Sequence, residues 1–193
     1  MAFYTFDQVR AAAQDVRRRT QKSDHQLLRE ARDTQRNSFD IFLSHSSRDK
    51  ELVIGAKKLI EDRGYSVYVD WIEDSELDRA AIDRGRADHL RRRMRQCESL
   101  FYVHTPNAAL SRWCPWELGF FDGLRQPERR VFVFPIVRAG EPYKGQEYLT
   151  LYDTVDLTTW VRPTGRRPPT VDPLEQRLLA DRLGILRRPG HIL

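Results

Sequence analysis

The chain has 193 residues, of which 40% are hydrophobic and 10% aromatic, and its formal net charge is +5 at pH 7. These values are typical of one globular domain with appendages and exclude an intrinsically disordered chain. No apolar run is long enough to cross a bilayer, and the first ten residues lack the basic and then apolar order of a secretory signal. We therefore expect no membrane partner.

Arginine supplies much of the positive charge, in short runs such as 17–19, 91–93 and 166–167. A basic balance of this kind is one mark of nucleic-acid-binding proteins. Here the runs are spread along the chain and are not interleaved with aromatic residues. We interpret most of them as solvated helix faces and do not predict nucleic-acid binding.

The cysteine and histidine pattern predicts no metal site. Cys97 and Cys114 lie in apolar segments, and neither they nor the five scattered histidines have the spacing of metal ligands. The acidic segment 73–78 also lacks the Asp/Asn/Gly spacing of a calcium loop. This cysteine usage favours a reducing, cytoplasmic setting.

The first segment, 1–37, predicts a helical extension made of two short helices. Thr5 with Gln8, and Ser23 with Gln26, have the spacing of capping boxes. Both helices are polar and offer few apolar residues for packing. Two interpretations remain open: an N-terminal hairpin, linker or arm used in assembly, or helices that simply pack on the surface of the following domain.

Four apolar segments predict strands, 39–44, 66–70, 99–104 and 131–137, and 153–157 predicts a short fifth. Helices are predicted between them, including one that ends at Gly64 and one over 111–124. Strands that alternate with helices predict an α/β fold with a parallel sheet of about five strands and helices on both faces. This domain spans 38–160, and a Pro- and Arg-rich linker with a C-terminal helix and tail follows over 161–193.

Glu117 is the strongest functional candidate in the chain. Ser111 as a cap and Pro115 in the first turn predict a helix in which Glu117 shares a face with Trp113 and Phe121. A carboxylate on an inward face is costly unless another group satisfies it. In parallel sheets ligands bind beyond the C-terminal ends of the strands, and this helix begins at that edge. The alternative is that Glu117 caps a helix or pairs with an arginine.

Three blocks of the chain resemble the Toll/interleukin receptor (TIR) domain. Residues 39–45 (FDIFLSH) resemble the first box of that family, and residues 64–70 (GYSVYVD) resemble its second strand. Residues 111–118 (SRWCPWEL) resemble the box in which a Glu follows a Trp by four positions. The order and intervals of the blocks agree too, so the resemblance covers roughly residues 38–160.

The resemblance implies a flavodoxin-like sheet and one of two functions. Some TIR domains only associate with other TIR domains, whereas others cleave the nicotinamide–ribose bond of NAD. We expect the second function, with NAD as substrate, no cofactor, and release of nicotinamide with ADP-ribose or a cyclic or conjugated ADP-ribose signal in bacterial antiphage defence. The expected partners are other copies of the domain and a downstream effector that senses the product.

Two other functions remain as alternatives. The first is a non-catalytic TIR–TIR interaction module. The second is nucleoside processing on a related sheet, which the Trp/Cys box disfavours.

The resemblance assigns the catalytic role to Glu117. Nicotinamide leaves NAD as a neutral ring and needs no general acid, so one carboxylate that stabilises the positive ribose suffices. The residues expected to bind the substrate come from strand ends and from the turn before Glu117: Ser44, His45, Ser46, Ser47, Trp71 and Trp113. Ordinary packing or turn formation is the alternative for each, and Trp116 is interpreted as core. We expect Trp71→Ala to weaken turnover while sparing thermal stability.

Overall fold

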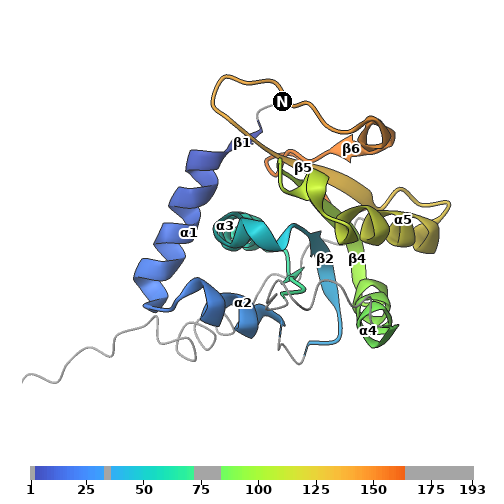
Figure 1. Cartoon of the computed structure of the whole chain (residues 1–193), viewed down its shortest axis with the longest axis horizontal. Helices are drawn as coiled ribbons and strands as arrows, with labels where there is room; N and C mark the ends of the chain where they lie inside the picture. The colour runs from blue at the N-terminus through green and yellow to red at the C-terminus, as the bar shows by residue number, and fades with distance from the viewer. Residues whose placement is uncertain (1–2, 33–35, 72–83, 164–193) are drawn as a thin grey trace, which may run out of the picture.

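Six parallel strands form the centre of the structure, a computed structural model that describes residues 3–32, 36–71 and 84–163 (Figure 1). The strands are β1 (Tyr4–Thr5), β2 (Phe39–Ser44), β3 (Val67–Tyr68), β4 (Cys97–His104), β5 (Val131–Val137) and β6 (Asp153–Thr154). Their order is β1-β5-β4-β2-β3, and β6 also pairs with β5. The predicted parallel α/β sheet is confirmed. The two-residue strand β1 is an addition, because so short a segment carries no periodicity that predicts a strand.

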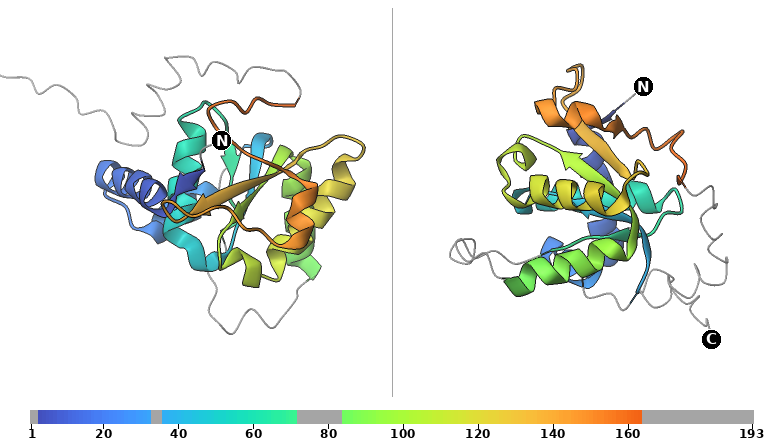
Figure 2. Two further views of the ribbon diagram at one scale, coloured as in Figure 1. Left: turned by 90° about the horizontal axis from the view of Figure 1, so that it is seen from above. Right: turned by 90° about the vertical axis from the view of Figure 1, so that its right-hand side faces the viewer.

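Helices cover both faces of the sheet, as the alternation predicted. They are α1 (Phe6–Thr20), α2 (Asp24–Arg32), α3 (Lys50–Glu61), α4 (Arg84–Arg95) and α5 (Trp113–Arg125). Figures 1 and 2 show α1 and α3 on one face, with α4 and α5 on the other. Short 3-10 helices lie at Ser47–Asp49, Ala108–Leu110 and Glu147–Leu151. Among the described residues no helix is both long and apolar enough to span a bilayer.

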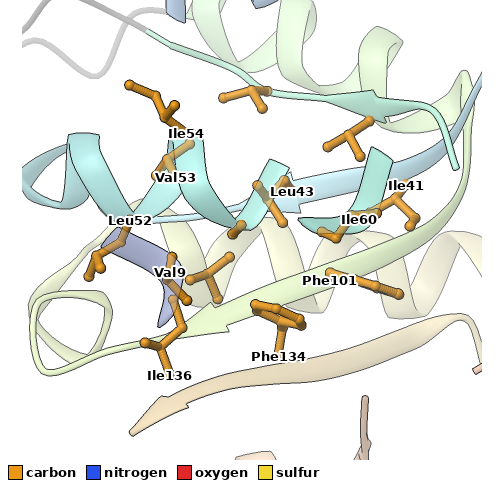
Figure 3. Close-up of a cluster of buried hydrophobic side chains, with 14 of the residues drawn as sticks. Val9, Ile41, Leu43, Leu52, Val53, Ile54, Ile60, Phe101, Phe134 and Ile136 are labelled. Atoms are coloured by element: carbon orange, nitrogen blue, oxygen red, sulfur yellow. The ribbon is translucent and has the colours of Figure 1, made fainter. Parts of the chain in front are cut away.

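Strand β2 is buried at all six of its positions, as expected for a central strand covered on both faces. From Ile41 to Leu43 its side chains alternate between two apolar clusters. Ile41 and Leu43 join the cluster beneath α1 and α3, which Figure 3 shows with Phe101 and Phe134 of the neighbouring strands. Phe42 joins the second cluster, beneath α4 and α5. The clusters hold β2 rigidly, and the chain that leaves it enters the candidate site.

The N-terminal extension forms two helices with both predicted capping boxes. Thr5 Oγ1 accepts a hydrogen bond from the Gln8 N–H, and the Thr5 N–H donates one to Gln8 Oε1. Ser23 and Gln26 exchange the same pair of hydrogen bonds. Helix α1 packs directly on α3, and its Val9 side chain is completely buried in the core. Of these interpretations the structure has surface packing, because α1 and α2 both pack on α3; the boundary at residue 38 stays a prediction.

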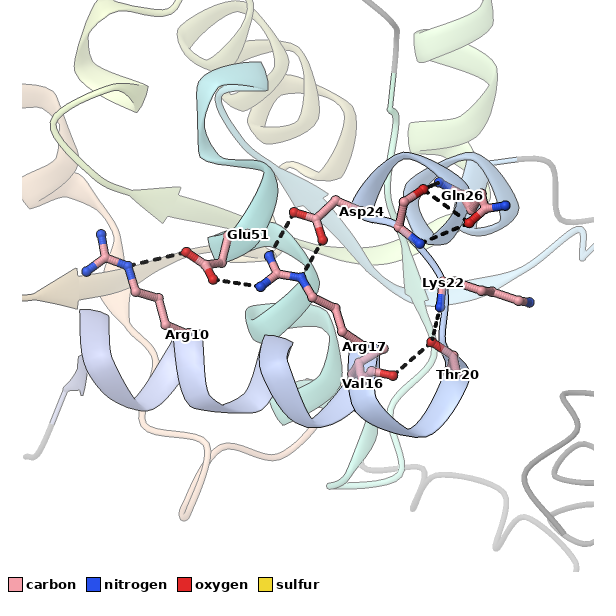
Figure 4. A network of polar contacts seen from close by, with 9 residues as sticks. Arg10, Val16, Arg17, Thr20, Lys22, Asp24, Gln26 and Glu51 are labelled. Atoms are coloured by element: carbon pink, nitrogen blue, oxygen red, sulfur yellow. Dashed lines mark hydrogen bonds and ion pairs between the residues drawn. The ribbon is translucent and has the colours of Figure 1, made fainter. Parts of the chain in front are cut away.

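Ion pairs connect the polar face of α1 to its neighbours (Figure 4). The Glu51 carboxylate of α3 lies 2.9 Å from Arg17 Nη1 and 3.4 Å from Arg10 Nε. Arg17 also donates two hydrogen bonds to Asp24, of 2.6 and 2.8 Å. Part of the arginine excess is therefore paired within the chain.

The segment after β6 closes the opposite end of the sheet from the candidate site. Arg162 Nη1 lies 2.7 Å from Asp40 Oδ1 at the start of β2, and both side chains are almost fully buried. The Asp40 carboxylate also accepts hydrogen bonds from the N–H and the hydroxyl of Ser66. The predicted C-terminal helix, around residues 174–183, lies outside the described residues.

Candidate active site

A cavity opens at the C-terminal ends of β2 and β3, beside the first turn of α5. Ten of the described residues line it: Phe42, Leu43, His45, Ser47, Asp70, Trp71, Arg86, Ser111, Trp113 and Glu117. In the sheet, β3 lies on one side of β2, and β4, which follows β3 in the sequence, lies on the other side of β2. Ligands of open α/β sheets bind at such a reversal of strand order. The structure thus brings together two of the predicted strand ends and the predicted helix.

Glu117 occupies a core position of α5. The inward face of the helix carries residues at spacings of three and four, namely Cys114, Glu117, Leu118 and Phe121, which are all buried. Only 7% of Glu117 is exposed. The Ser44 hydroxyl at the end of β2 donates a hydrogen bond of 2.6 Å to Glu117 Oε2. Ser44 is therefore the hydrogen-bond partner that the buried carboxylate needs, and the sequence alone did not identify it.

The start of α5 explains why Glu117 faces inward. Ser111 Oγ accepts hydrogen bonds of 3.3 Å from the N–H groups of Trp113 and Cys114, which confirms it as the capping side chain. Pro115 lies in the first turn, where its missing N–H costs no helical hydrogen bond. These two residues set the helix start, and Glu117 follows one turn later.

The environment of Glu117 favours its protonated form. Burial raises the pKa of Glu117 to about 7, and the negative charge of Asp70 adds to the rise. The Ser44 hydrogen bond and the positive charge of Arg86 lower the same pKa and so oppose the rise. A carboxyl group that titrates near neutrality in a cavity is a typical feature of an active site.

The turn after β2 divides into residues that line the cavity and residues that build the turn. His45 and Ser47 line the cavity, whereas Ser44 and Ser46 do not. Ser44 hydrogen-bonds to Glu117, and Ser46 Oγ accepts a hydrogen bond from the Arg48 N–H at the start of the 3-10 helix. Of the predicted substrate-binding residues Ser44 to Ser47, two therefore line the cavity, and the other two hydrogen-bond to groups beside it.

Asp49 lies at the capping position before α3, but its side chain has a different role. It makes no side-chain capping hydrogen bond. Its buried carboxylate instead accepts hydrogen bonds from Thr105 and Asn107 in the loop after β4. The physical reason is the intervening 3-10 turn, which Ser46 caps and which directs Asp49 toward the neighbouring loop.

His45 and Trp71 stack on each other at the edge of the cavity, with ring centroids 5.9 Å apart and planes 5° apart. His45 Nδ1 lies 2.8 Å from the Leu43 carbonyl oxygen, and burial lowers the pKa of His45 from 6.5. A neutral ring that donates Nδ1–H to this carbonyl has Nε2 as an acceptor.

Trp71 is only 3% exposed and belongs to the apolar cluster beneath α1 and α3. This burial contradicts the expectation that Trp71→Ala would spare stability. Truncation of a buried tryptophan costs about 3–5 kcal/mol. Trp71 therefore both supports the core and lines the cavity.

Trp113 is half-buried and lines the cavity, with the Arg86 guanidinium 4.9 Å from the centre of its ring. Trp116 lies edge-on to Trp113 at 5.3 Å and stacks on Phe120 at 5.8 Å. Trp116 is half-buried and is absent from the cavity lining, so its packing role is confirmed although it lies at the periphery of the core.

Sequence reasoning missed the position of Asp70 at the cavity. Its side chain is 7% exposed, and its Oδ1 lies 3.3 Å from the Tyr68 hydroxyl and 3.8 Å from His89 Nε2. A signal was present, because Asp70 ends a predicted strand at the edge where ligands bind. The sequence pattern indicated Glu117 as the single carboxylate of the site, and Asp70 was not among the predicted site residues.

Comparison with known proteins agrees with this geometry. A family model described as TIR domain matches residues 41–167. A Bacillus cereus (strain MSX-D12) protein named as a probable 3' cyclic ADP-D-ribose synthase, ThsB', is 47% identical over 128 residues, which are 65% of each chain. A Cytobacillus dafuensis protein named as a candidate cyclic ADP-D-ribose synthase, TIR2, is 30% identical over 83 residues.

The second match covers 42% of this chain and 22% of its relative, so the chain spans less than two thirds of either relative's length. The family model, in contrast, covers more than half of the chain and includes β2, the cavity and α5. The parallel sheet, the Glu117 helix at its edge and this match together show that the chain belongs to the TIR domain family.

Proposed function

We propose that this chain cleaves the nicotinamide–ribose bond of NAD, releases nicotinamide and closes the remaining ADP-ribose into a cyclic product. The observation that carries the proposal is the buried Glu117 carboxyl at the sheet edge, with Ser44 as its hydrogen-bond donor. Both relatives are named as cyclic ADP-D-ribose synthases, which supports a cyclic product over simple hydrolysis.

The proposed chemistry needs one anion beside the ribose. As the bond between nicotinamide and ribose carbon C1″ breaks, its electron pair neutralises the pyridinium ring, and positive charge develops on the ribose. Ionised Glu117 stabilises that charge from a buried position, where electrostatic interactions are stronger than in bulk water. Ser44 holds the carboxylate in place and favours its ionised form, because it lowers the pKa of Glu117.

We propose that the other lining residues bind the substrate. His45 Nε2 and the Ser47 hydroxyl offer hydrogen bonds, and Trp71 and Trp113 offer apolar walls for the nicotinamide and ribose. Ser46 contributes through the turn that it caps rather than through the cavity. Substrate binding by these residues is the role that the TIR resemblance suggested.

The name of the Bacillus cereus relative specifies a 3' cyclic product, and primed positions denote ribose carbons. We therefore propose that the group that attacks C1″ is a hydroxyl of the adenosine ribose. From the TIR resemblance we further propose that the product is a cytoplasmic signal in bacterial antiphage defence, that the domain assembles with other copies, and that a downstream effector senses the product.

The test is incubation of the full chain with NAD over a range of protein concentrations, because assembly can be needed for activity. Chromatography with mass spectrometry quantifies nicotinamide and the cyclic product. Glu117→Gln should lower nicotinamide release at least about 100-fold, as expected for loss of an electrostatic stabiliser. Glu141→Gln is the matched control, because Glu141 is exposed and makes only a 3.9 Å ion pair with Arg138.

Equal turnover by Glu117→Gln and wild type would contradict the assignment of Glu117. No nicotinamide release by wild type at any protein concentration would contradict the enzyme function itself. Self-association without turnover would then support the alternative, an interaction module.

A further inference from the structure

The cavity contains a second carboxylate, that of Asp70, which has no role in the proposed cleavage of the nicotinamide–ribose bond. Asp70 lines the cavity together with Glu117, and its charge contributes to the raised pKa of Glu117. The two residues come from different elements, the end of β3 and the first turns of α5. A second buried carboxylate at the site needs a reason, because each buried charge is costly.

A chain of polar groups leads from the surface to Asp70. Arg92 Nη2 lies 3.0 Å from His89 Nδ1, and His89 Nε2 lies 3.3 Å from the Tyr68 hydroxyl. The Tyr68 hydroxyl lies 3.3 Å from Asp70 Oδ1. Arginine can only donate, so Nδ1 accepts, His89 donates Nε2–H to Tyr68, and Tyr68 donates to Asp70.

This series of hydrogen bonds fixes the orientation of the Asp70 carboxylate. Tyr68 is completely buried and His89 is half-buried, so the donors are held by packing. Burial lowers the pKa of His89, and the positive charges of Arg92 and Arg93 lower it further, whereas the charge of Asp70 raises it. The His89 ring is therefore in the neutral form that this series of hydrogen bonds requires. Among the described residues, the Tyr68 hydroxyl and His89 Nε2 both approach Asp70 at Oδ1. Within this described part of the chain, its second oxygen is left for a ligand in the cavity.

The chemistry of cyclisation requires an acceptor for one proton. When a ribose hydroxyl attacks C1″, its oxygen forms the new bond and must lose its proton. Glu117, which is hydrogen-bonded to Ser44, stabilises the positive charge on the ribose and is therefore not assigned to this proton. In sugar chemistry of this kind, one carboxyl group commonly acts on the ring carbon while another handles the proton.

We infer that Asp70 is the general base that accepts the proton of the attacking ribose hydroxyl, with Tyr68 and His89 as positioning residues. The inference rests on the proposed function. The C1″–nitrogen bond breaks and its electron pair stays with nicotinamide, the hydroxyl oxygen bonds to C1″, and the proton passes to Asp70 and then to solvent. NAD is thereby converted to cyclic ADP-ribose, nicotinamide and one proton, with no oxidant or further reactant.

The test compares two nucleophiles that attack C1″: the ribose hydroxyl, which must lose a proton, and a pyridine base, which has no proton to lose. A free pyridine base such as 3-acetylpyridine attacks C1″ through a ring nitrogen with no proton to lose, and its exchange into NAD reports cleavage and an intact site. In Asp70→Asn, which keeps an acceptor for Tyr68, base exchange should remain within a few-fold of wild type. The rate of cyclic product formation should fall at least about 10-fold relative to exchange, within the range typical of general-base loss.

Asp122→Asn is the matched control. Asp122 on α5 also accepts a hydrogen bond of 3.3 Å from a tyrosine hydroxyl, that of Tyr152, but it does not line the cavity. The ratio of cyclic product to base exchange should be unchanged in this variant. Tyr68→Phe provides a second variant if Asp70→Asn does not fold, and it should lower the same ratio several-fold because Asp70 loses its orientation.

Three results would overturn the inference. The first is an unchanged ratio of cyclic product to exchange in Asp70→Asn. The second is an equal loss of exchange and cyclisation in folded Asp70→Asn, which would make Asp70 part of binding or cleavage. The third is wild-type chain without nicotinamide release, which defeats the proposed function first and the inference with it.

Discussion

The hydrogen bond between Ser44 and Glu117 opposes the effect of burial on the same carboxyl group. Burial favours the neutral acid, which has no charge to stabilise the ribose, whereas a hydroxyl donor favours the anion. The balance leaves the carboxyl close to half ionised near neutral pH. At the scale of a single residue, the activity of this chain should therefore depend on pH through Glu117.

Ser44→Ala should shift this dependence upward. Without the hydroxyl donor the pKa of Glu117 rises above about 7. A hydrogen bond to a charged group contributes about 1.5–3 kcal/mol, which corresponds to an upward shift of roughly 1–2 pH units. The measurement is the pH dependence of kcat/KM for NAD. Ser99→Ala, at a fully buried serine of β4 outside the cavity lining, should leave the dependence unchanged; an unshifted profile in Ser44→Ala would contradict the assignment.

Glu117→Gln should make the protein more stable at pH 8. The folded-state pKa of about 7 lies above the ordinary value of 4.5, so the folded state binds the proton more tightly than the unfolded state. The stability of wild type therefore falls as pH rises from 4.5 to about 7, by about 3 kcal/mol in total. The glutamine variant avoids this cost.

Urea unfolding at several pH values provides the measurement. The stability difference between Glu117→Gln and wild type should be largest above pH 7 and should disappear below pH 4.5, where both states of wild type hold the proton. A difference independent of pH would show that packing, rather than charge, causes it.

At the scale of elements, α1 and α3 approach each other closely because α3 carries a glycine at the contact. A Cβ placed on Gly55 would lie 1.9 Å from the Val9 carbonyl oxygen. Helices that approach this closely need a residue without a side chain at the crossing point. The contact explains how the polar N-terminal helix joins the core through few apolar residues.

Gly55→Ala should destabilise the protein although alanine favours helices. The new methyl group collides with backbone rather than with a flexible side chain, and overpacking of this kind costs about 1–3 kcal/mol. Gly123→Ala on α5 is the control, since no atom lies within 4 Å of its added Cβ. That variant should gain up to about 1 kcal/mol from helix propensity. Urea unfolding of both variants checks the prediction, and equal effects would refute it.

At the scale of the whole molecule, the N-terminal extension and the TIR domain share one core. Strand β1 pairs with β5, and Val9 and Ala13 of α1 are completely buried. Glu51 of α3 holds ion pairs with two arginines of α1. The extension therefore has the contacts of an integral layer of the fold.

Deletion of residues 1–37 should lower the thermal unfolding temperature markedly or make the domain insoluble, because it exposes the core surface that α1 covers. Val9→Asp should destabilise the full chain in the same direction, through a buried unpaired charge. Ala11→Asp, at an exposed position of α1, should change little. If the truncated chain unfolds at the wild-type temperature, the extension is a separate unit after all.

The sequence by itself determined the longer helices and strands, because their signals are local. Apolar runs mark β2, β4 and β5, capping boxes mark α1 and α2, and Ser111 with Pro115 marks the start of α5. The same local periodicity placed Glu117 on an inward face. The alternation of strands and helices then determined a parallel sheet and the edge at which its loops meet.

Only the tertiary structure decided which groups surround Glu117. Its hydrogen-bond donor, Ser44, lies 73 residues away in the sequence, and no local pattern connects the two. The burial of Trp71, the pairing of β1 with β5 and the position of Asp70 beside Glu117 likewise depend on how the elements pack. Periodicity shows which face of an element points inward; the partners that it meets there are a property of the assembled fold.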